Sequence, residues 1–205
     1  MKISDIGGEE YLDEILKTKW VDDKLEPLFR GTGILYANNT DAMKITVGND
    51  FRKSSMDSAT TSHDTANKLS KVKLGVNIRS GLFATFDYDV AEDYTHYTGE
   101  SGSKVVFVIP ADNSKLYTSS TVDDFYTDVD QVAKRKFKTV NNVYSSPDEF
   151  LIKQLIPEYV DSLIEVTPSN ASKFYDTEKE IIIFGDVYLV SYAFARKRLP
   201  HFLDI

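Results

Sequence analysis

The strongest constraint on the fold is an apolar stretch near the end of the sequence, residues 180–192, in which β-branched and aromatic residues dominate. Such side chains favour strands because they fit a pleated, largely buried surface. Gly185 and Asp186 interrupt the stretch, and a glycine followed by a polar residue is typical of a tight hairpin turn. The sequence therefore predicts a β-hairpin with strands at 180–184 and 187–192.

Similar apolar segments predict strands elsewhere in the chain. Residues 104–109 form a β-branched run that Pro110 closes, which indicates a buried strand. Residues 28–33 and 81–86 are shorter runs beside glycines and also favour strands.

Helical spacing of apolar residues predicts four helices, at residues 9–25, 89–97, 122–137 and 147–163. Residues 38–73 are rich in Asn, Asp, Ser, Thr and Lys and lack apolar periodicity. They are predicted to form a long loop with at most a short helix at 64–72. Helices early in the chain and strands scattered late favour an α+β fold over a regular βαβ alternation.

Length and composition limit the classes of protein. A chain of 205 residues fits one domain, 1–205, in which 1–27 form an N-terminal helical segment. The net charge of −8 argues against a nucleic-acid partner bound through phosphate contacts. The absence of cysteine excludes disulfides and thiolate chemistry. The polar start and the lack of a long apolar run predict a cytoplasmic protein with no membrane partner.

Familiar nucleotide and metal motifs are missing. Gly31 and Gly33 have no third glycine three residues further on, so the dinucleotide fingerprint of a doubly wound sheet fails. His63, His96 and His201 are scattered singly and give no metal-ligand spacing, so no metal site is expected.

Three separated segments carry residue types that suit a catalytic site. Arg30 lies in an apolar strand, where burying a guanidinium is costly unless a carboxylate or another anion meets it. Thr85 is a hydroxyl among apolar neighbours, and strand alternation places Glu178 and Glu180 on one face. Each feature alone favours a plain interpretation: a structural ion pair, a β-favouring threonine and a solvated strand edge.

Taken in order, the three segments resemble ADP-ribosyltransferases of the arginine–serine–glutamate class, specifically the arginine-specific Glu-x-Glu type and its phage-encoded members. That family has an arginine in an early strand, a Ser-Thr-Ser strand in mid-chain and a Glu-x-Glu strand followed by aliphatic residues. Here these are Arg30, the Ala-Thr-Phe of residues 84–86, and residues 178–183. The resemblance covers residues 28–192.

Two further details support the resemblance. Ala91 and Tyr94 match an Ala-x-x-Tyr pattern in the helix after the middle strand, and Arg79 precedes Thr85 at a spacing similar to that of phage-encoded members. One departure is Ala84, which stands where the family usually has a serine that helps to hold the catalytic glutamate.

The resemblance implies a mono-ADP-ribosyltransferase fold of two packed, mainly antiparallel sheets with an N-terminal helix and flanking helices. It implies NAD as substrate and a protein acceptor, for instance of a bacterial host, modified on arginine. Glu180 would stabilise the oxocarbenium-like transition state, Arg30 would hold the diphosphate or the nicotinamide ribose, and Glu178 would be the acceptor-side base. Phe174 and Tyr175 would face the acceptor. The implied NAD-binding set also includes Gly31, Arg79, Thr85, which would orient Glu180, and Phe86.

Two alternatives stay open at this point. One is a catalytically worn version of the fold that serves as a phage structural or host-binding protein, favoured by Ala84 and the long loop. The other is NAD hydrolysis without a protein acceptor, which does not need both Glu178 and Glu180. A phage-encoded enzyme would act in the host cytoplasm or travel in the virion.

Overall fold

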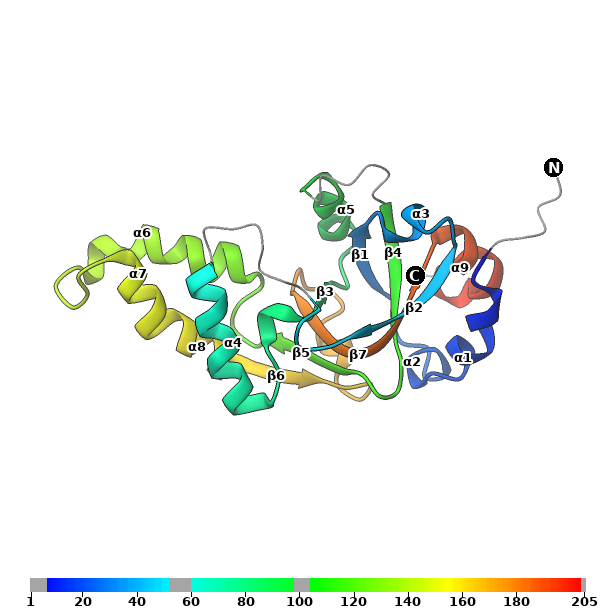
Figure 1. The fold of residues 1–205 in the computed structure, drawn as a ribbon, viewed down its shortest axis with the longest axis horizontal. Helices are drawn as coiled ribbons and strands as arrows, with labels where there is room; N and C mark the ends of the chain where they lie inside the picture. The colour runs from blue at the N-terminus through cyan, green and yellow to red at the C-terminus, as the bar shows by residue number, and fades with distance from the viewer. Residues whose placement is uncertain (1–6, 52–59, 98–103, 204–205) are drawn as a thin grey trace.

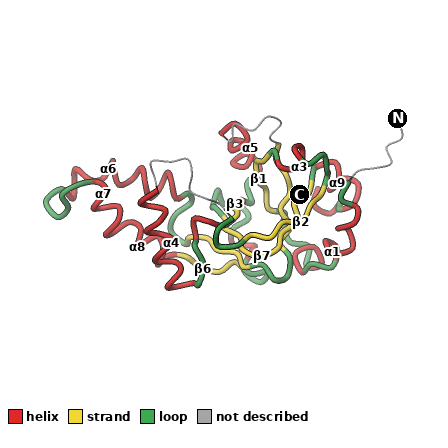
Figure 2. Tube along the Cα trace, viewed as in Figure 1, coloured by secondary structure: helices red, strands yellow, loops and turns green. Residues whose placement is uncertain are grey.

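The computed structural model describes residues 7–51, 60–97 and 104–203 and shows an α+β fold (Figures 1 and 2). Within these ranges the strands are β1 (Leu28–Thr32), β2 (Ala42–Val47), β3 (Leu82–Ala84), β4 (Lys104–Pro110), β5 (Lys115–Ser119), β6 (Leu163–Val166) and β7 (Ile181–Val190). All of their pairings are antiparallel, in the order β1-β4-β7-β5-β6, with β2 and β3 also paired to β7. The predicted strands at 28–33, 81–86 and 104–109 are confirmed.

The described α-helices are mostly short, namely α1 (Leu12–Leu16), α2 (Lys19–Asp22), α3 (Ile34–Ala37), α4 (Thr60–Leu74), α5 (Tyr88–Tyr97), α6 (Gln131–Val140), α7 (Pro147–Phe150), α8 (Ile156–Ser162) and α9 (Tyr192–Arg198). Five-residue π-helical turns at Tyr126–Asp130 and Leu151–Leu155 precede α6 and join α7 to α8. Short 3-10 turns lie at Glu9–Tyr11, Ile78–Ser80, Ala171–Lys173 and Pro200–Leu203. Figure 1 shows α4, α6, α7 and α8 grouped at one end of the molecule, which we call the helical lobe.

β7 is the central strand, and it belongs to both halves of the sheet. Its first residues pair with β3 and β5, and its residues from 185 onward pair with β2 and β4. Gly185 lies between the two halves at φ +103°, and a Cβ there would lie 2.9 Å from the Ser114 Cα. The strand therefore bends at a position that requires glycine, and the expected two packed sheets are two halves of one sheet.

The predicted hairpin at 180–192 is wrong. β2 pairs without interruption along β7 from Val47 opposite Gly185 to Ala42 opposite Val190. The Asp186 carboxylate is held by the Thr46 hydroxyl at 2.6 Å. Because a neighbouring strand runs through the Gly-Asp step, the chain keeps its direction and the glycine produces a bend, not a turn.

The predicted long loop at 38–73 is also wrong, because this segment contains β2 and most of α4; residues 52–59 lie outside the described part. The helix expected at 64–72 is confirmed and is longer. α4 buries only small side chains such as Ala66 and Ser70, so it lacks the large apolar residues that reveal a helix in sequence.

The helix predicted at 89–97 is confirmed as the uninterrupted α5. The helix predicted at 122–137 begins at Tyr126 with a π turn and continues as α6 to Val140, and the remaining two are interrupted. The N-terminal helix at 9–25 is split because Thr18 caps α2, its hydroxyl accepting a hydrogen bond from the Val21 amide at 3.3 Å. The helix at 147–163 gains a π turn and ends at Ser162, where β6 begins. β5 and β6 were not predicted.

Buried residues of β4 and β7 form the centre of the core, namely 106–109, 181–184 and 187–190. In the described ranges, no helix has the length and apolar character needed to cross a membrane.

Candidate functional site

The three segments singled out in the sequence lie on adjacent strands. Phe29 of β1 and Thr85 exchange two backbone hydrogen bonds, of 2.7 and 3.0 Å. β3 then pairs with β7 in a register that sets Ala84 opposite Ile181, the residue after Glu180. Segments far apart in the chain, carrying Arg30, Thr85 and Glu180, therefore meet around β3.

Glu180 is fixed at its backbone and at its carboxylate. Its amide donates to the Asp123 carbonyl at 2.8 Å, and its carbonyl accepts from the Thr118 hydroxyl at 2.9 Å. Its side chain is 14% exposed, and Oε2 lies 2.6 Å from Nη1 of Arg79. The carboxylate is therefore charge-paired, held in one direction and still reachable from solvent.

The partner of Glu180 is a deeply buried arginine. The Arg79 side chain is 5% exposed, and its guanidinium carbon lies 4.4 Å from the ring centres of both Phe83 and Phe125. Burial lowers the pKa of Arg79, but the Glu180 carboxylate and Tyr159 raise it, and the net shift is upward. Aromatic faces and a carboxylate thus keep this buried guanidinium charged.

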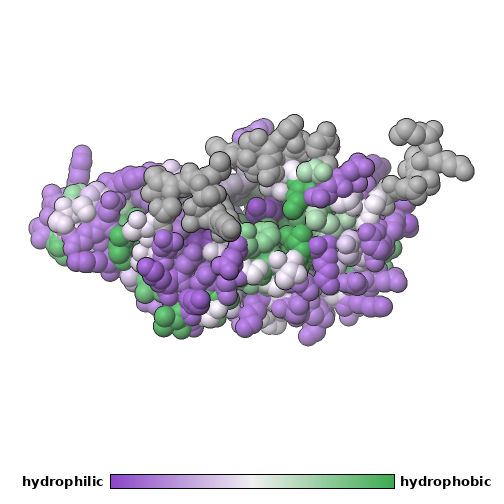
Figure 3. Space-filling model, viewed as in Figure 1, coloured by the Kyte–Doolittle hydropathy of each residue, from purple (hydrophilic) through white to green (hydrophobic). Residues whose placement is uncertain are grey.

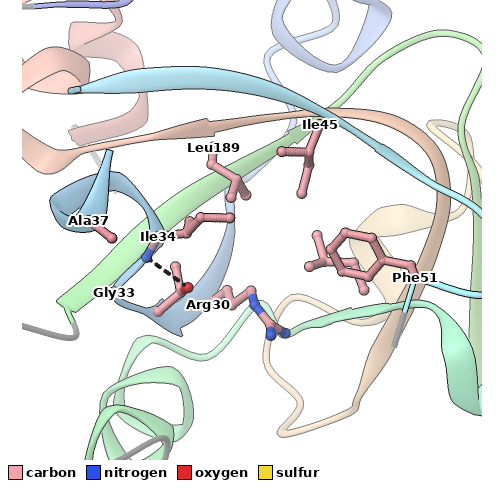
Figure 4. A pocket seen from close by; sticks show the side chains of 9 residues that line it. Arg30, Gly33, Ile34, Ala37, Ile45, Phe51 and Leu189 are labelled. Carbon is pink, nitrogen blue, oxygen red and sulfur yellow. Dashed lines mark hydrogen bonds between the residues drawn. The ribbon is translucent and has the colours of Figure 1, made fainter. Parts of the chain in front are cut away.

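Arg30 lies on the wall of a cavity of about 520 Å³ (Figure 4). Its Nη1 donates to the carbonyl of Phe83 at 2.6 Å. The cavity is lined by Arg30, Thr32, Gly33, Ile34, Ala37, Ile45, Phe51, Leu82 and Leu189. Figure 3 shows apolar side chains gathered over the region where β1 and β2 lie. The lining is mostly apolar with one cationic group, and Thr85, Glu178 and Glu180 are not part of it.

Gly31 has a packing role. A Cβ at this position would lie 2.7 Å from the Ala91 carbonyl and 2.8 Å from the Thr95 amide, both in α5. The absence of a side chain therefore lets α5 pack directly on β1, which is a structural reason for the glycine. Its approach to the nicotinamide amide stays a prediction.

The structure assigns the orientation of Glu180 to residues other than Thr85. The Thr85 hydroxyl accepts from the Asp87 amide at 3.1 Å and so shapes the turn into α5. Ala84 shares a face with its cross-strand partner Ile181, and successive residues alternate, so Ala84 does not face Glu180. A serine at position 84 would therefore not reach the carboxylate, and Arg79 holds it instead.

Of the aromatic residues predicted to face ligands, Phe86 and Phe174 belong to the core, and Tyr175 is partly buried against it. Phe86 and Phe174 are 5% and 6% exposed. Phe86 stacks on Trp20 and meets the Tyr175 ring edge-on at 5.0 Å. The Tyr175 hydroxyl accepts from the Glu26 amide at 3.4 Å. Burial leaves Phe86 and Phe174 little surface for a ligand, whereas Tyr175 is partly exposed and its facing an acceptor stays a prediction.

Glu178 and Glu180 stand in different environments although a single residue separates them. Both precede β7, and Glu178 is exposed. Between them, Nζ of Lys179 lies 2.9 Å from Oδ1 of Asp123 and ties the segment down. The Glu178 carboxylate is thus in solvent, whereas the Glu180 carboxylate is ion-paired with Arg79. The two glutamates are therefore suited to different chemical roles.

Several residues around Glu180 carried no signal in the sequence, because they come from β5, from the connection between β5 and α6, and from α8. They include Thr118, Asp123, Phe125 and Tyr159. Tyr94 of α5 donates to Oδ2 of Asp124 at 3.2 Å. Burial, and then Asp124 and Glu180, raise the pKa of Tyr94.

Among the described residues there is no group of three or more His, Asp or Glu side chains that could hold a metal ion. Comparison of the chain with protein-family models, curated proteins and solved structures finds no match.

Proposed function

We propose that the protein is a mono-ADP-ribosyltransferase that uses NAD and modifies a protein acceptor on arginine. The observation that supports this most is the meeting of β1, β3 and β7, which brings together the segments bearing Arg30, Thr85 and Glu180. A cavity of about 520 Å³ lies beside Arg30, and Glu180 is not among the residues that line it.

In this reaction the bond between the ribose C1′ and the nicotinamide nitrogen breaks, and its electron pair leaves with neutral nicotinamide. The ionised Glu180 carboxylate stabilises the positive charge that develops on the ribose and accepts a hydrogen bond from its 2′-hydroxyl. The Arg30 guanidinium offers a fork of donors to the diphosphate. The acceptor nitrogen then bonds to C1′, and exposed Glu178 removes its proton.

The test uses purified protein and NAD labelled in its ADP-ribose part. Nicotinamide release and label on protein are measured with a bacterial lysate, with buffer alone and with a small guanidino compound as competing acceptor. We expect nicotinamide release in all three and labelled protein only with lysate, reduced by the guanidino compound. Failure to release nicotinamide under any of these conditions would reject the proposal.

A second candidate is a non-enzymatic host-binding or particle protein with this fold. It is favoured by the Arg79–Glu180 ion pair, which occupies one carboxylate oxygen, and by Phe83 beside it. NAD binding measured by calorimetry, together with the absence of turnover, would support this candidate.

A further inference from the structure

The Ile78–Ser80 turn, which contains Arg79, is held against one face of α4 by hydrogen bonds. Oδ1 of Asn67 accepts from the Arg79 amide at 2.7 Å. The Ser70 hydroxyl, one helical turn further on, accepts from the Ile78 amide at 3.0 Å and donates to the Val76 carbonyl at 2.9 Å. Two side chains of α4 thus satisfy consecutive amides of the turn and fix where the arginine leaves the backbone.

The guanidinium of Arg79 contacts aromatic rings from two different elements. Phe83 comes from β3 and Phe125 from the connection between β5 and α6, and they leave the flat group little rotational freedom. Nη1 of Arg79 meets Glu180, whereas its buried Nε has no hydrogen-bond partner in the part of the chain that the structure describes. A buried unpaired N–H lowers stability, so this placement needs an explanation other than the stability of Arg79 itself.

We propose that Arg79 is the positioning residue for Glu180, and that α4 sets its position through Asn67 and Ser70. This assignment rests on the proposed function. The assignment explains how the Glu180 carboxylate is oriented although position 84 is an alanine. Ala84 lies on the opposite face of the β3–β7 pair from Glu180. One face of α4 is then coupled to the catalytic glutamate through Asn67 and Ser70, and the connection between β5 and α6 supplies one of the two rings.

The first test compares Arg79→Gln with Arg79→Lys in steady-state nicotinamide release across pH. An adjacent cation favours an ionised carboxylate, so its loss makes Glu180 harder to ionise. We expect Arg79→Gln to lower kcat by roughly 10²-fold, as for other preorganised electrostatic groups, with KM for NAD little changed. The acid limb of the pH–rate profile of Arg79→Gln should move to higher pH. Arg79→Lys should keep the acid limb of the wild-type profile and recover part of kcat.

The charged and titratable groups near Glu180 besides Arg79 come from three directions. Tyr159 lies on α8, Tyr94 and its partner Asp124 lie on the α5 side, and the Lys179–Asp123 pair lies beside the strand. These groups are the same in Arg79→Gln and Arg79→Lys. A difference between the acid limbs of the two pH–rate profiles is therefore due to the cation at position 79.

The second test avoids substitution of a buried charge, which can prevent folding. Asn67→Ala removes the hydrogen bond to the Arg79 amide and leaves the guanidinium in place. Lys73→Gln is the matched control, since Lys73 joins the same helix to the carbonyls of Val160 and Asp161 without touching the turn. We expect kcat per folded molecule to fall several-fold in Asn67→Ala and to stay at the wild-type value in Lys73→Gln.

The outcomes separate this assignment from the proposed function. Wild-type protein without NAD turnover overturns both. Active wild type, with an unshifted acid limb in Arg79→Gln and equal kcat in Asn67→Ala and Lys73→Gln, leaves the proposed function standing and rejects positioning by Arg79.

Discussion

Two arginines approach β3, and their surroundings differ. Arg79 lies between two aromatic rings with a carboxylate at one end and is almost entirely buried. Arg30 is partly exposed, donates to the Phe83 carbonyl and lines a cavity. The Arg79 region is closed by its own side chains, whereas the Arg30 region presents a cation to an open volume.

The difference separates two uses of the same side chain. A guanidinium enclosed by protein groups acts on its neighbours, so its removal should change stability and the behaviour of Glu180. A guanidinium on a cavity wall acts on what enters the cavity, so its removal should change ligand binding. If the comparison holds, variants of the two regions will differ in which measurement they alter.

The largest effect is expected for Glu180→Gln. Turnover should fall by about 10²- to 10³-fold, because a preorganised charge at the reacting centre is lost. The free energy of unfolding should also fall by about 2 kcal/mol, because Arg79 keeps its charge in a buried place without a counter-ion. Nicotinamide release and urea unfolding measure the two. Wild-type turnover in this variant would remove Glu180 from the mechanism.

Glu178→Gln should have the next largest effect, and on one activity only. Transfer to protein should fall by roughly 10²-fold, as when a general base is removed, with nicotinamide release largely intact. Because the Glu178 side chain is exposed, the substitution should leave the melting temperature unchanged. Both rates are measured on the same preparation. Equal loss of release and transfer would place Glu178 in NAD cleavage and not on the acceptor side.

Arg30→Lys tests the open region. Lysine keeps the charge but lacks the flat fork, so NAD binding should weaken by roughly fivefold, the equivalent of about one ordinary hydrogen bond. The melting temperature without NAD should stay close to that of the wild type. Calorimetric titration and thermal unfolding measure these quantities. A much lower melting temperature with normal NAD binding would make Arg30 a structural residue, like Arg79.

The smallest effect compares one threonine from each region. Thr118→Val removes the buried hydrogen bond to the Glu180 carbonyl and should lower the free energy of unfolding by about 1 kcal/mol. The Thr32 hydroxyl, on the cavity wall, accepts a hydrogen bond from the Ile34 amide at 3.3 Å. In a variant without this hydroxyl, a water molecule in the cavity can accept the same hydrogen bond. Thr32→Val should therefore cost only about 0.5 kcal/mol. The reverse order in urea unfolding would contradict the distinction between closed and open regions.

The sequence predicts those parts of the fold that large apolar residues define. β1, β3, β4 and α5 follow from such runs, and so does the apolar character of β7. β2 was not predicted because it is a short strand within a segment rich in polar residues, and only part of α4 was predicted because small and polar residues form it. The direction of the chain at Gly185 could not be predicted either, since it depends on β2 running alongside.

For the site, sequence order was sufficient to choose Arg30, Thr85 and Glu180 but not to assign their contacts. The ion pair of Glu180 with Arg79 depends on α4 and Phe125, which no motif connects to it. Phe174 illustrates the opposite error. Its position just before the paired glutamates suggested a ligand surface, whereas its size and apolar character place it in the core.

The shared strand β7 has a consequence for the order of folding. Among the described residues, β2 and β3 have strand registers only with β7, which follows every other strand in the chain. During synthesis, β1 and β4 or β5 and β6 can pair early, but neither half of the sheet can close before residues 181–190 have left the ribosome. We therefore expect late, non-local folding, with the Glu180 site assembling in the same step as the sheet.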